Sequence, residues 1–302
     1  MKFQLVILAL IALAPIHIFA CSNDGKEGYL PENLHEIPIG NKWSNGSTEK
    51  SFNAIIDKIS YIYKPIIAGY GKELIIEKDW KDKSINAYAA RRNNKYIVHA
   101  DGGLARSSYI TSDGFALVIC HEIGHHIGGL PRSVVDGEVE WSANEGQADY
   151  FSTTKCLRKV FKDDNNKKIV SDMPVPFHVI QKCKWQFKGQ GDDQYLCQRS
   201  AMAALSTSSL HSWSSDIRAS LEFDLPSKVK VRDTKHGHPD PQCRLDTYFQ
   251  GALCEVDHSV DFTVELNEDH RDIGACTAEA GHTYGVRPRC WFQPIKRDIW
   301  GF

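Results

Sequence analysis

The run Cys-His-Glu-Ile-Gly-His-His contains the pattern HExxH at His121, Glu122 and His125. On an α-helix, residues four positions apart lie about 40° apart around the axis, so both imidazoles can face one metal ion. Glu122 lies about 100° further round from His121, where its carboxylate misses the ion but reaches a water beside it. The pattern indicates metal-dependent hydrolysis, with Glu122 as the general base.

Because so short a motif also arises by chance, its surroundings must support it. Ser112 and Asp113 favour the start of a helix, and residues 115–119 are apolar. Two glycines and a proline within residues 128–131 favour its end. We therefore expect a buried helix that carries the motif.

A catalytic zinc takes three protein ligands and leaves one position open. Glu145 is the best candidate for the third ligand beside His121 and His125, because an apolar pattern at helical spacing follows it. Asp149 lies one turn further on, where it would accept the free ring N–H of a zinc histidine. We expect one Zn²⁺ per chain. The alternative is that Ser142 and Glu145 form only a capping box and that Asp149 is solvated.

The N-terminus resembles a bacterial signal peptide. Lys2 precedes an apolar run over residues 3–19, and Cys21 follows in a lipobox-like context. Residues 1–20 are predicted to be removed, with lipidation of Cys21 providing possible membrane attachment. The expected location is the periplasm or the outer membrane as a lipoprotein, and secretion after simple cleavage is the alternative. No later stretch approaches the roughly twenty apolar residues of a membrane span.

Residues 21–50 are rich in Asn, Gly, Lys and Glu and are predicted to form a flexible tether. Residues 51–302 are then expected to form a single metallopeptidase domain, which their number can supply. The net charge of −2 and the lack of a basic stripe argue against nucleic acid as a partner.

Of the nine cysteines, eight remain after Cys21, which suits an oxidising compartment. A bridge between Cys120 and Cys156 is favoured over zinc ligation by Cys120, which points away from the mean direction of the two histidines. Short spacings favour three further pairs, namely Cys183 with Cys197, Cys243 with Cys254, and Cys276 with Cys290.

The remaining elements are predicted from periodicity and turn residues. A helix over residues 51–63 should stop at Pro65, and short strands are expected at 73–77 and 95–99. A charged, disulfide-stapled excursion over residues 162–196 and a helix over 198–223 should follow. The C-terminal region after His236 should be compact and irregular, stapled by disulfides, with one helix near residues 242–253.

Residues 85–89, between the two expected strands, are predicted to form an edge strand. A peptide substrate can extend a sheet edge by backbone hydrogen bonds, which would align its scissile carbonyl beside the metal. The residues concerned are Asn86, Ala87, Tyr88 and Ala89. An ordinary core strand is the alternative.

Taken together, these segments resemble the gluzincin family that contains the CAAX prenyl endopeptidases and the HtpX-type bacterial membrane proteases. The matching pieces are Asn-Ala-Tyr-Ala at 86–89, Gly103-Leu104, the helix over 117–125, Glu-Gly-Gln-Ala-Asp at 145–149 and His-Pro-Asp-Pro-Gln-Cys-Arg at 238–244. The resemblance implies that Glu145 is the third zinc ligand. It also implies that His238 donates a hydrogen bond to the oxyanion or covers the zinc in a resting state, and that Arg244 supports it.

The resemblance covers roughly residues 50–160 and 234–254. The sequence shows no counterpart of the multiple transmembrane helices found in the family's integral members. We expect an α+β, zincin-like fold with a small twisted sheet packed on the HExxH helix. The predicted function is zinc-dependent endopeptidase cleavage of envelope or extracellular polypeptides. The alternatives are a latent protease whose zinc is capped, or a zinc-containing assembly protein that holds unfolded clients with little cleavage.

Overall fold

Helices and two small sheets alternate along the chain in the computed structural model, which describes residues 28–295 apart from 32, 216, 218 and 219. The predicted signal peptide and Cys21 lie outside these residues. Among the described residues, no helix is long and apolar enough to cross a membrane. The strands are β1 (Glu73–Asp79), β2 (Ala87–Arg92), β3 (Lys95–Asp101), β4 (Arg132–Val135) and β5 (Glu138–Ala143). The α-helices are α1 (Glu49–Gly69), α2 (Gly102–Arg106), α3 (Ser112–Ile127), α4 (Glu145–Phe151), α5 (Leu157–Phe161), α6 (Asn166–Ser171), α7 (Phe177–Gln186), α8 (Asp193–Ser214) and α9 (Pro241–Leu253), with a π-helix at Ser152–Cys156 and a 3₁₀-helix at Glu268–His270.

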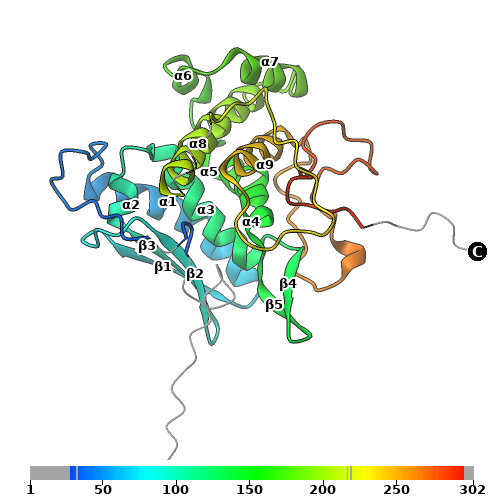
Figure 1. Ribbon diagram of the computed structural model, residues 1–302, viewed down its shortest axis with the longest axis horizontal. Helices are drawn as coiled ribbons and strands as arrows, with labels where there is room; N and C mark the ends of the chain where they lie inside the picture. The colour runs from blue at the N-terminus through cyan, green and yellow to red at the C-terminus, as the bar shows by residue number, and fades with distance from the viewer. Residues whose placement is uncertain (1–27, 32, 216, 218–219, 296–302) are drawn as a thin grey trace, which may run out of the picture.

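The larger sheet has the strand order β1-β3-β2, in which β1 runs parallel to β3 and β2 runs antiparallel to it. Both predicted strands are present, each two residues longer than expected. Helix α3 packs against β2 and β3, and α1 packs against β1 (Figure 1). The mixed α+β class is therefore confirmed, and β2 lies at one edge of this sheet as predicted.

Helix α3 carries the HExxH pattern and is buried on all sides from Gly114 to Ile127. Its N-cap is Thr111, not Ser112 or Asp113, because Thr111 has the extended backbone that a cap requires and its hydroxyl accepts from the Gly114 N–H. The helix ends at Gly128, as the glycines predicted.

A short β-hairpin connects α3 to the next helix. The turn between β4 and β5 is Asp136-Gly137, and both residues have positive φ, which suits a two-residue hairpin. Asn144 follows β5 and caps α4 by accepting from the Gln147 N–H. The capping box considered for Ser142 therefore does not form, and Glu145 is the first residue of α4.

Helix α1 continues through Pro65 to Gly69, so the predicted stop at Pro65 is wrong. Proline removes one helical hydrogen bond, which leaves the carbonyl of the residue four positions earlier, Tyr61, without its donor. Pro65 and Tyr61 are both on the exposed face, where water can satisfy that carbonyl.

The segment that precedes α1 is not a flexible tether over its described part. Tyr29 and Leu30 are completely buried, and Ile37 is 8% exposed. Bridges from Glu36 to Ser84 and from residue 44 to residue 107 hold the segment to the domain. The polar composition was misleading because three apolar side chains suffice to anchor it.

Four disulfides link the described residues. Cys120–Cys156 and Cys183–Cys197 are as predicted. The other two predicted pairs are wrong, because the structure joins Cys243 to Cys290 and Cys254 to Cys276. Sequence spacing favours bonds between cysteines that are close in the chain. In the structure Cys243 and Cys254 lie at opposite ends of α9, and each forms a disulfide with a different C-terminal loop.

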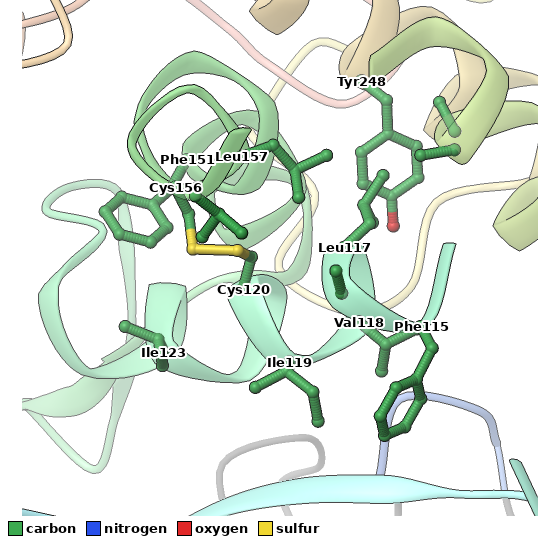
Figure 2. Close-up of a cluster of buried hydrophobic side chains, with 14 of the residues drawn as sticks. Phe115, Leu117, Val118, Ile119, Cys120, Ile123, Phe151, Cys156, Leu157 and Tyr248 are labelled. Carbon is green, nitrogen blue, oxygen red and sulfur yellow. A yellow bond between two sulfur atoms is a disulfide. The ribbon is translucent and has the colours of Figure 1, made fainter. Parts of the chain in front are cut away.

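The Cys120–Cys156 disulfide ties α3 to the π-helix that follows α4. Figure 2 shows it among the buried side chains of Ile123, Phe151 and Leu157. Both cysteines are completely buried. Since Cys120 adjoins His121, this bond fixes the middle of the HExxH helix against the chain that carries Glu145.

The remaining helices broadly follow expectation. The excursion over residues 162–196 contains α6 and α7 and is stapled to α8 by Cys183–Cys197. Helix α8 begins at Asp193 and ends at Ser214, so it lies earlier than the predicted range. Helix α9 begins one residue before its predicted start, with Pro241 in its first turn.

We predict that replacing Cys120 and Cys156 together by alanine lowers the free energy of unfolding by about 4 kcal/mol, from loop closure across 36 residues. The Cys183–Cys197 pair closes 14 residues, and its removal should cost about 3 kcal/mol. Guanidinium unfolding of both double variants measures this. Equal stability of wild type and the Cys120/Cys156 variant would contradict the prediction.

Candidate metal centre

The structure brings the predicted ligands together. His121 Nε2 lies 3.3 Å from Glu145 Oε2, and His125 Nε2 lies 3.6 Å from Glu145 Oε1. All three side chains are at most 3% exposed. Glu122 joins the cluster, because ligand atoms of His121, Glu122 and His125 lie within 4.8 Å of one another.

These spacings fit a metal ion. Two donors that each lie 2.0–2.1 Å from a tetrahedral zinc are separated by about 3.3–3.4 Å. His121 Nε2 and Glu145 Oε2 are both buried, and neither makes a hydrogen bond of acceptable geometry among the described residues. Buried polar atoms that lack a hydrogen bond to protein usually contact an ion or a water molecule. The buried group of His121, Glu122 and His125 can therefore hold a metal ion, and the Glu145 carboxylate lies 3.3 and 3.6 Å from its two histidines.

The two histidines are oriented from behind. His125 Nδ1 donates to the Ala143 carbonyl at 2.8 Å, which leaves its Nε2 lone pair facing Glu145. His121 Nδ1 lies 2.7 Å from Asp149 Oδ1, so this ring also has its Nδ1 held by a neighbour and its Nε2 turned toward Glu145. Such outer partners fix the tautomer and raise the basicity of a metal-binding histidine. Asp149 thus occupies the supporting position predicted for it.

The electrostatics of the cluster follow from burial and neighbouring charge. Burial lowers the pKa of His125 to about 4, so this ring is neutral and able to ligate. Burial acts in the same direction on His121, but the Asp149 and Glu145 carboxylates outweigh it and raise its pKa to about 9. Burial raises the pKa of Glu122 to about 8, against the opposing effect of His121. Burial would also raise the pKa of Glu145, but the surrounding imidazoles, His238 and His121 above all, keep it well below its usual range.

Arg244 compensates the buried carboxylates. Its Nη2 donates to Asp149 Oδ1 at 2.6 Å, and its Nη1 lies 3.8 Å from Glu145 Oε2. The Tyr248 hydroxyl, one helical turn along α9, also donates to Asp149 Oδ1 at 2.5 Å. Arg244 is completely buried, and its charged partners among the described residues are the carboxylates of Asp149 and Glu145 and not His238, which the family resemblance had it support.

His238 lies at the rim of the centre. Its Nε2 is 3.4 Å from Glu145 Oε2 and 3.2 Å from the Gly28 carbonyl. The loop that carries it is fixed beside α4, because Asn144 Nδ2 donates to the Lys235 carbonyl and the Glu145 N–H donates to the His236 carbonyl. The predicted His-Pro segment thus does reach the site.

Helices α3 and α4 approach closely enough to form the centre because small residues meet. A Cβ atom on Gly124 would lie 3.0 Å from both Ala148 Cα and Phe151 Cδ1. Real Cβ contacts at this distance are tight, so a larger residue at Gly124 would push the helices apart. The glycine of the HExxH run therefore sets the separation between the histidines and Glu145.

The predicted edge strand lies beside the centre, but its residues differ in role. Ala87 O and the Asn86 amide bind the chain's own residues 29 and 30. Ala89 is buried and pairs with β3, whereas Tyr88 points to the opposite face and stacks on His99 at 4.8 Å.

Sequence reasoning missed three residues that wall the site, namely Tyr29, His211 and Tyr248. Tyr248 could have been found, because it lies four residues after Arg244 and so shares its face of α9. Tyr29 stands in a polar stretch and His211 in a helix without clear periodicity, so neither carried a signal. His126, which extends the HExxH run, instead bonds the Ile97 carbonyl and joins α3 to β3.

Comparison of the chain with protein family models, with curated proteins and with solved structures finds no match. The geometry above therefore carries the functional argument alone.

We predict that Asp149→Asn lowers zinc affinity by roughly 10–100-fold, because the amide cannot hold His121 as the carboxylate does. Asp113→Asn is the matched control, since this carboxylate pairs with Arg199 at 2.8 Å at the far end of α3. Competition against a chromogenic zinc chelator gives both affinities. Unchanged affinity in Asp149→Asn would show that the carboxylate plays no part in binding.

Proposed function

We propose that this chain is a zinc-dependent endopeptidase of the gluzincin type, with a zincin-like catalytic domain. The observation that carries the proposal is the convergence of two histidine Nε2 atoms on the Glu145 carboxylate, at 3.3 and 3.6 Å, with Glu122 in the same buried cluster. A purely structural site needs no additional carboxylate of this kind and commonly closes with cysteine.

His121, His125 and Glu145 would hold the ion. When bound, zinc supplies Lewis acidity that polarises a scissile carbonyl and makes a water easier to deprotonate. Two imidazoles and one carboxylate are a known catalytic ligand set for zinc, which supports this choice of metal.

Glu122 acts as the general base and then as the general acid. It accepts a proton from the attacking water and passes it to the leaving amine nitrogen. Burial raises the pKa of Glu122 to about 8, so its carboxyl group holds a proton more readily than an exposed glutamate does.

Other side chains position the reacting peptide. His238 Nε2 lies where it can donate to a carbonyl oxygen that becomes negative, and Arg244 fixes the charge behind Glu145. The Ala87 carbonyl at the start of β2 and the Asn86 amide beside it bind backbone groups of residues 29 and 30, and an extended peptide that displaced these residues could use the same groups. This arrangement favours a polypeptide substrate over a compact small molecule.

The four disulfides are typical of proteins that fold in an oxidising compartment. We therefore propose that the substrates are envelope or extracellular polypeptides. The N-terminal sequence supports export, with attachment through a lipidated Cys21 as part of this proposal.

We predict that Glu122→Gln retains zinc but lowers peptidase turnover by roughly 10²–10⁴-fold, because the amide cannot accept the proton. Hydrolysis of fluorescent unfolded casein by purified residues 22–302 measures turnover, and metal analysis of both samples measures zinc. Glu138→Gln, an exposed carboxylate on β5, is the control and should keep full activity.

Two outcomes would redirect the assignment. Full activity in Glu122→Gln would remove this mechanism. Zinc in every sample without cleavage would favour the alternative in which the centre belongs to a binding or assembly protein.

A further inference from the structure

The candidate centre is covered by a segment of its own chain. His121, Glu122 and His125 are completely buried, and Glu145 is 2% exposed. A catalytic centre that acts on polypeptides must be reachable by them. Residues 28–30 lie directly over it, and all three are buried.

Residues 29 and 30 are held by one backbone bond to Ala87 and by the Asn86 side chain. The Tyr29 N–H donates to the Ala87 carbonyl at 2.7 Å. The Asn86 side chain binds both backbone groups of Leu30, accepting from its N–H at 3.0 Å and donating to its carbonyl at 3.3 Å. On the side of residues 29 and 30 only backbone groups take part, so the same bonds can hold a peptide of varied sequence.

The peptide bond before Tyr29 lies at the centre itself. The Gly28 carbonyl accepts from His238 Nε2 at 3.2 Å, and the same nitrogen is 3.4 Å from Glu145 Oε2. His238 thus contacts a backbone carbonyl of the segment and a candidate metal ligand at the same time.

The side chain of Tyr29 fills a pocket beside this carbonyl. Its ring meets His121 edge-on at 5.0 Å between centroids and lies 4.6 Å from the His211 ring. The Arg244 guanidinium lies 4.7 Å from the Tyr29 ring centroid, and the Tyr248 hydroxyl is 3.0 Å from the Tyr29 hydroxyl. The pocket therefore recognises both an aromatic ring and a hydroxyl group.

Gly28 is the point at which the segment is most tightly fitted. A Cβ atom there would lie 2.4 Å from the Ala87 carbonyl oxygen and 2.5 Å from Asn86 Oδ1. Both distances are far below van der Waals contact, and the first partner is backbone. One added methyl group should therefore displace the segment from the edge of β2.

We propose that residues 28–30 are a tethered occupant of the peptide-binding groove of this centre, and that the groove accepts extended peptides with a tyrosine at the Tyr29 position. The proposal rests on the proposed function, because it names the regulation and the substrate preference of the same site. Residues 28–30 block access until they are displaced, and a tethered ligand at millimolar effective concentration does this efficiently.

The first test displaces the segment without deleting it. Gly28→Ala should raise casein hydrolysis by residues 22–302 on the order of 10- to 100-fold, because the open fraction of the centre increases. Gly69→Ala is the control, since a Cβ at Gly69 meets no atom within 4 Å. A Gly28→Ala variant with lower activity than wild type would overturn the proposal, since the segment would then be part of the working site.

The second test separates the segment after the protein has folded. A recognition sequence for a site-specific protease is inserted after Leu34, whose side chain is 96% exposed. The chain is cut and dialysed, and binding of a fluorescent peptide with the sequence Gly-Tyr-Leu-Pro is measured by polarisation. Binding should be on the order of 10- to 100-fold tighter to the cut chain than to the uncut chain. The peptide with alanine in place of tyrosine should bind weakly to both.

The outcomes separate this proposal from the proposed function. Peptide binding that requires the cut, without casein hydrolysis in any sample, supports the occupant and removes the peptidase assignment. Equal hydrolysis by cut and uncut chains, lost in Glu122→Gln, supports the peptidase and overturns the occupant. Unfolding of the chain on removal of the segment, or failure of the cut chain to bind the peptide, also overturns it.

Discussion

Two carboxylates, Glu145 and Asp149, are buried one helical turn apart, and the arrangement of the site follows from the need to balance their charge. An isolated carboxylate is very costly to bury, so each must face a cation or strong donors. Asp149 faces His121, Arg244 and Tyr248, whereas Glu145 faces three imidazole nitrogens at 3.3–3.6 Å and the Arg244 guanidinium at 3.8 Å. The partners of Glu145 are thus more distant than those of Asp149, which leaves its carboxylate better placed to bind an ion.

The clustering of the candidate ligands was predictable because it depends on local spacing. Four residues on one helix place His121 and His125 together, and a second helix that begins with a carboxylate supplies Glu145. Asp149 was also reached from helical spacing, whereas the family resemblance pointed to Arg244 but not to its pairing with Asp149. Comparable logic extended by one turn would have reached Tyr248.

What escaped prediction depends on contacts between distant segments. The composition of residues 21–50 predicts a tether, because it cannot reveal that the Tyr29 side chain packs against Arg244 and Tyr248, which lie more than two hundred residues later in the sequence. Two disulfide pairings were wrong for the same reason, since cysteine spacing contains no information on which loop returns to which end of α9. The extension of α1 through Pro65 shows a third limit, in which solvent exposure decides whether a proline ends a helix.

The separation between Tyr29 and Tyr248 has a consequence for the order in which the protein matures. The two residues are 219 positions apart, so Tyr29 leaves the ribosome long before its pocket exists. His211, His238 and Arg244, which surround it, are also synthesised late. Long-range contacts of this kind form slowly, after most of the chain is available. The centre and its cover are thus completed together, and biosynthesis offers no interval in which an assembled centre lacks residues 28–30 on the same chain.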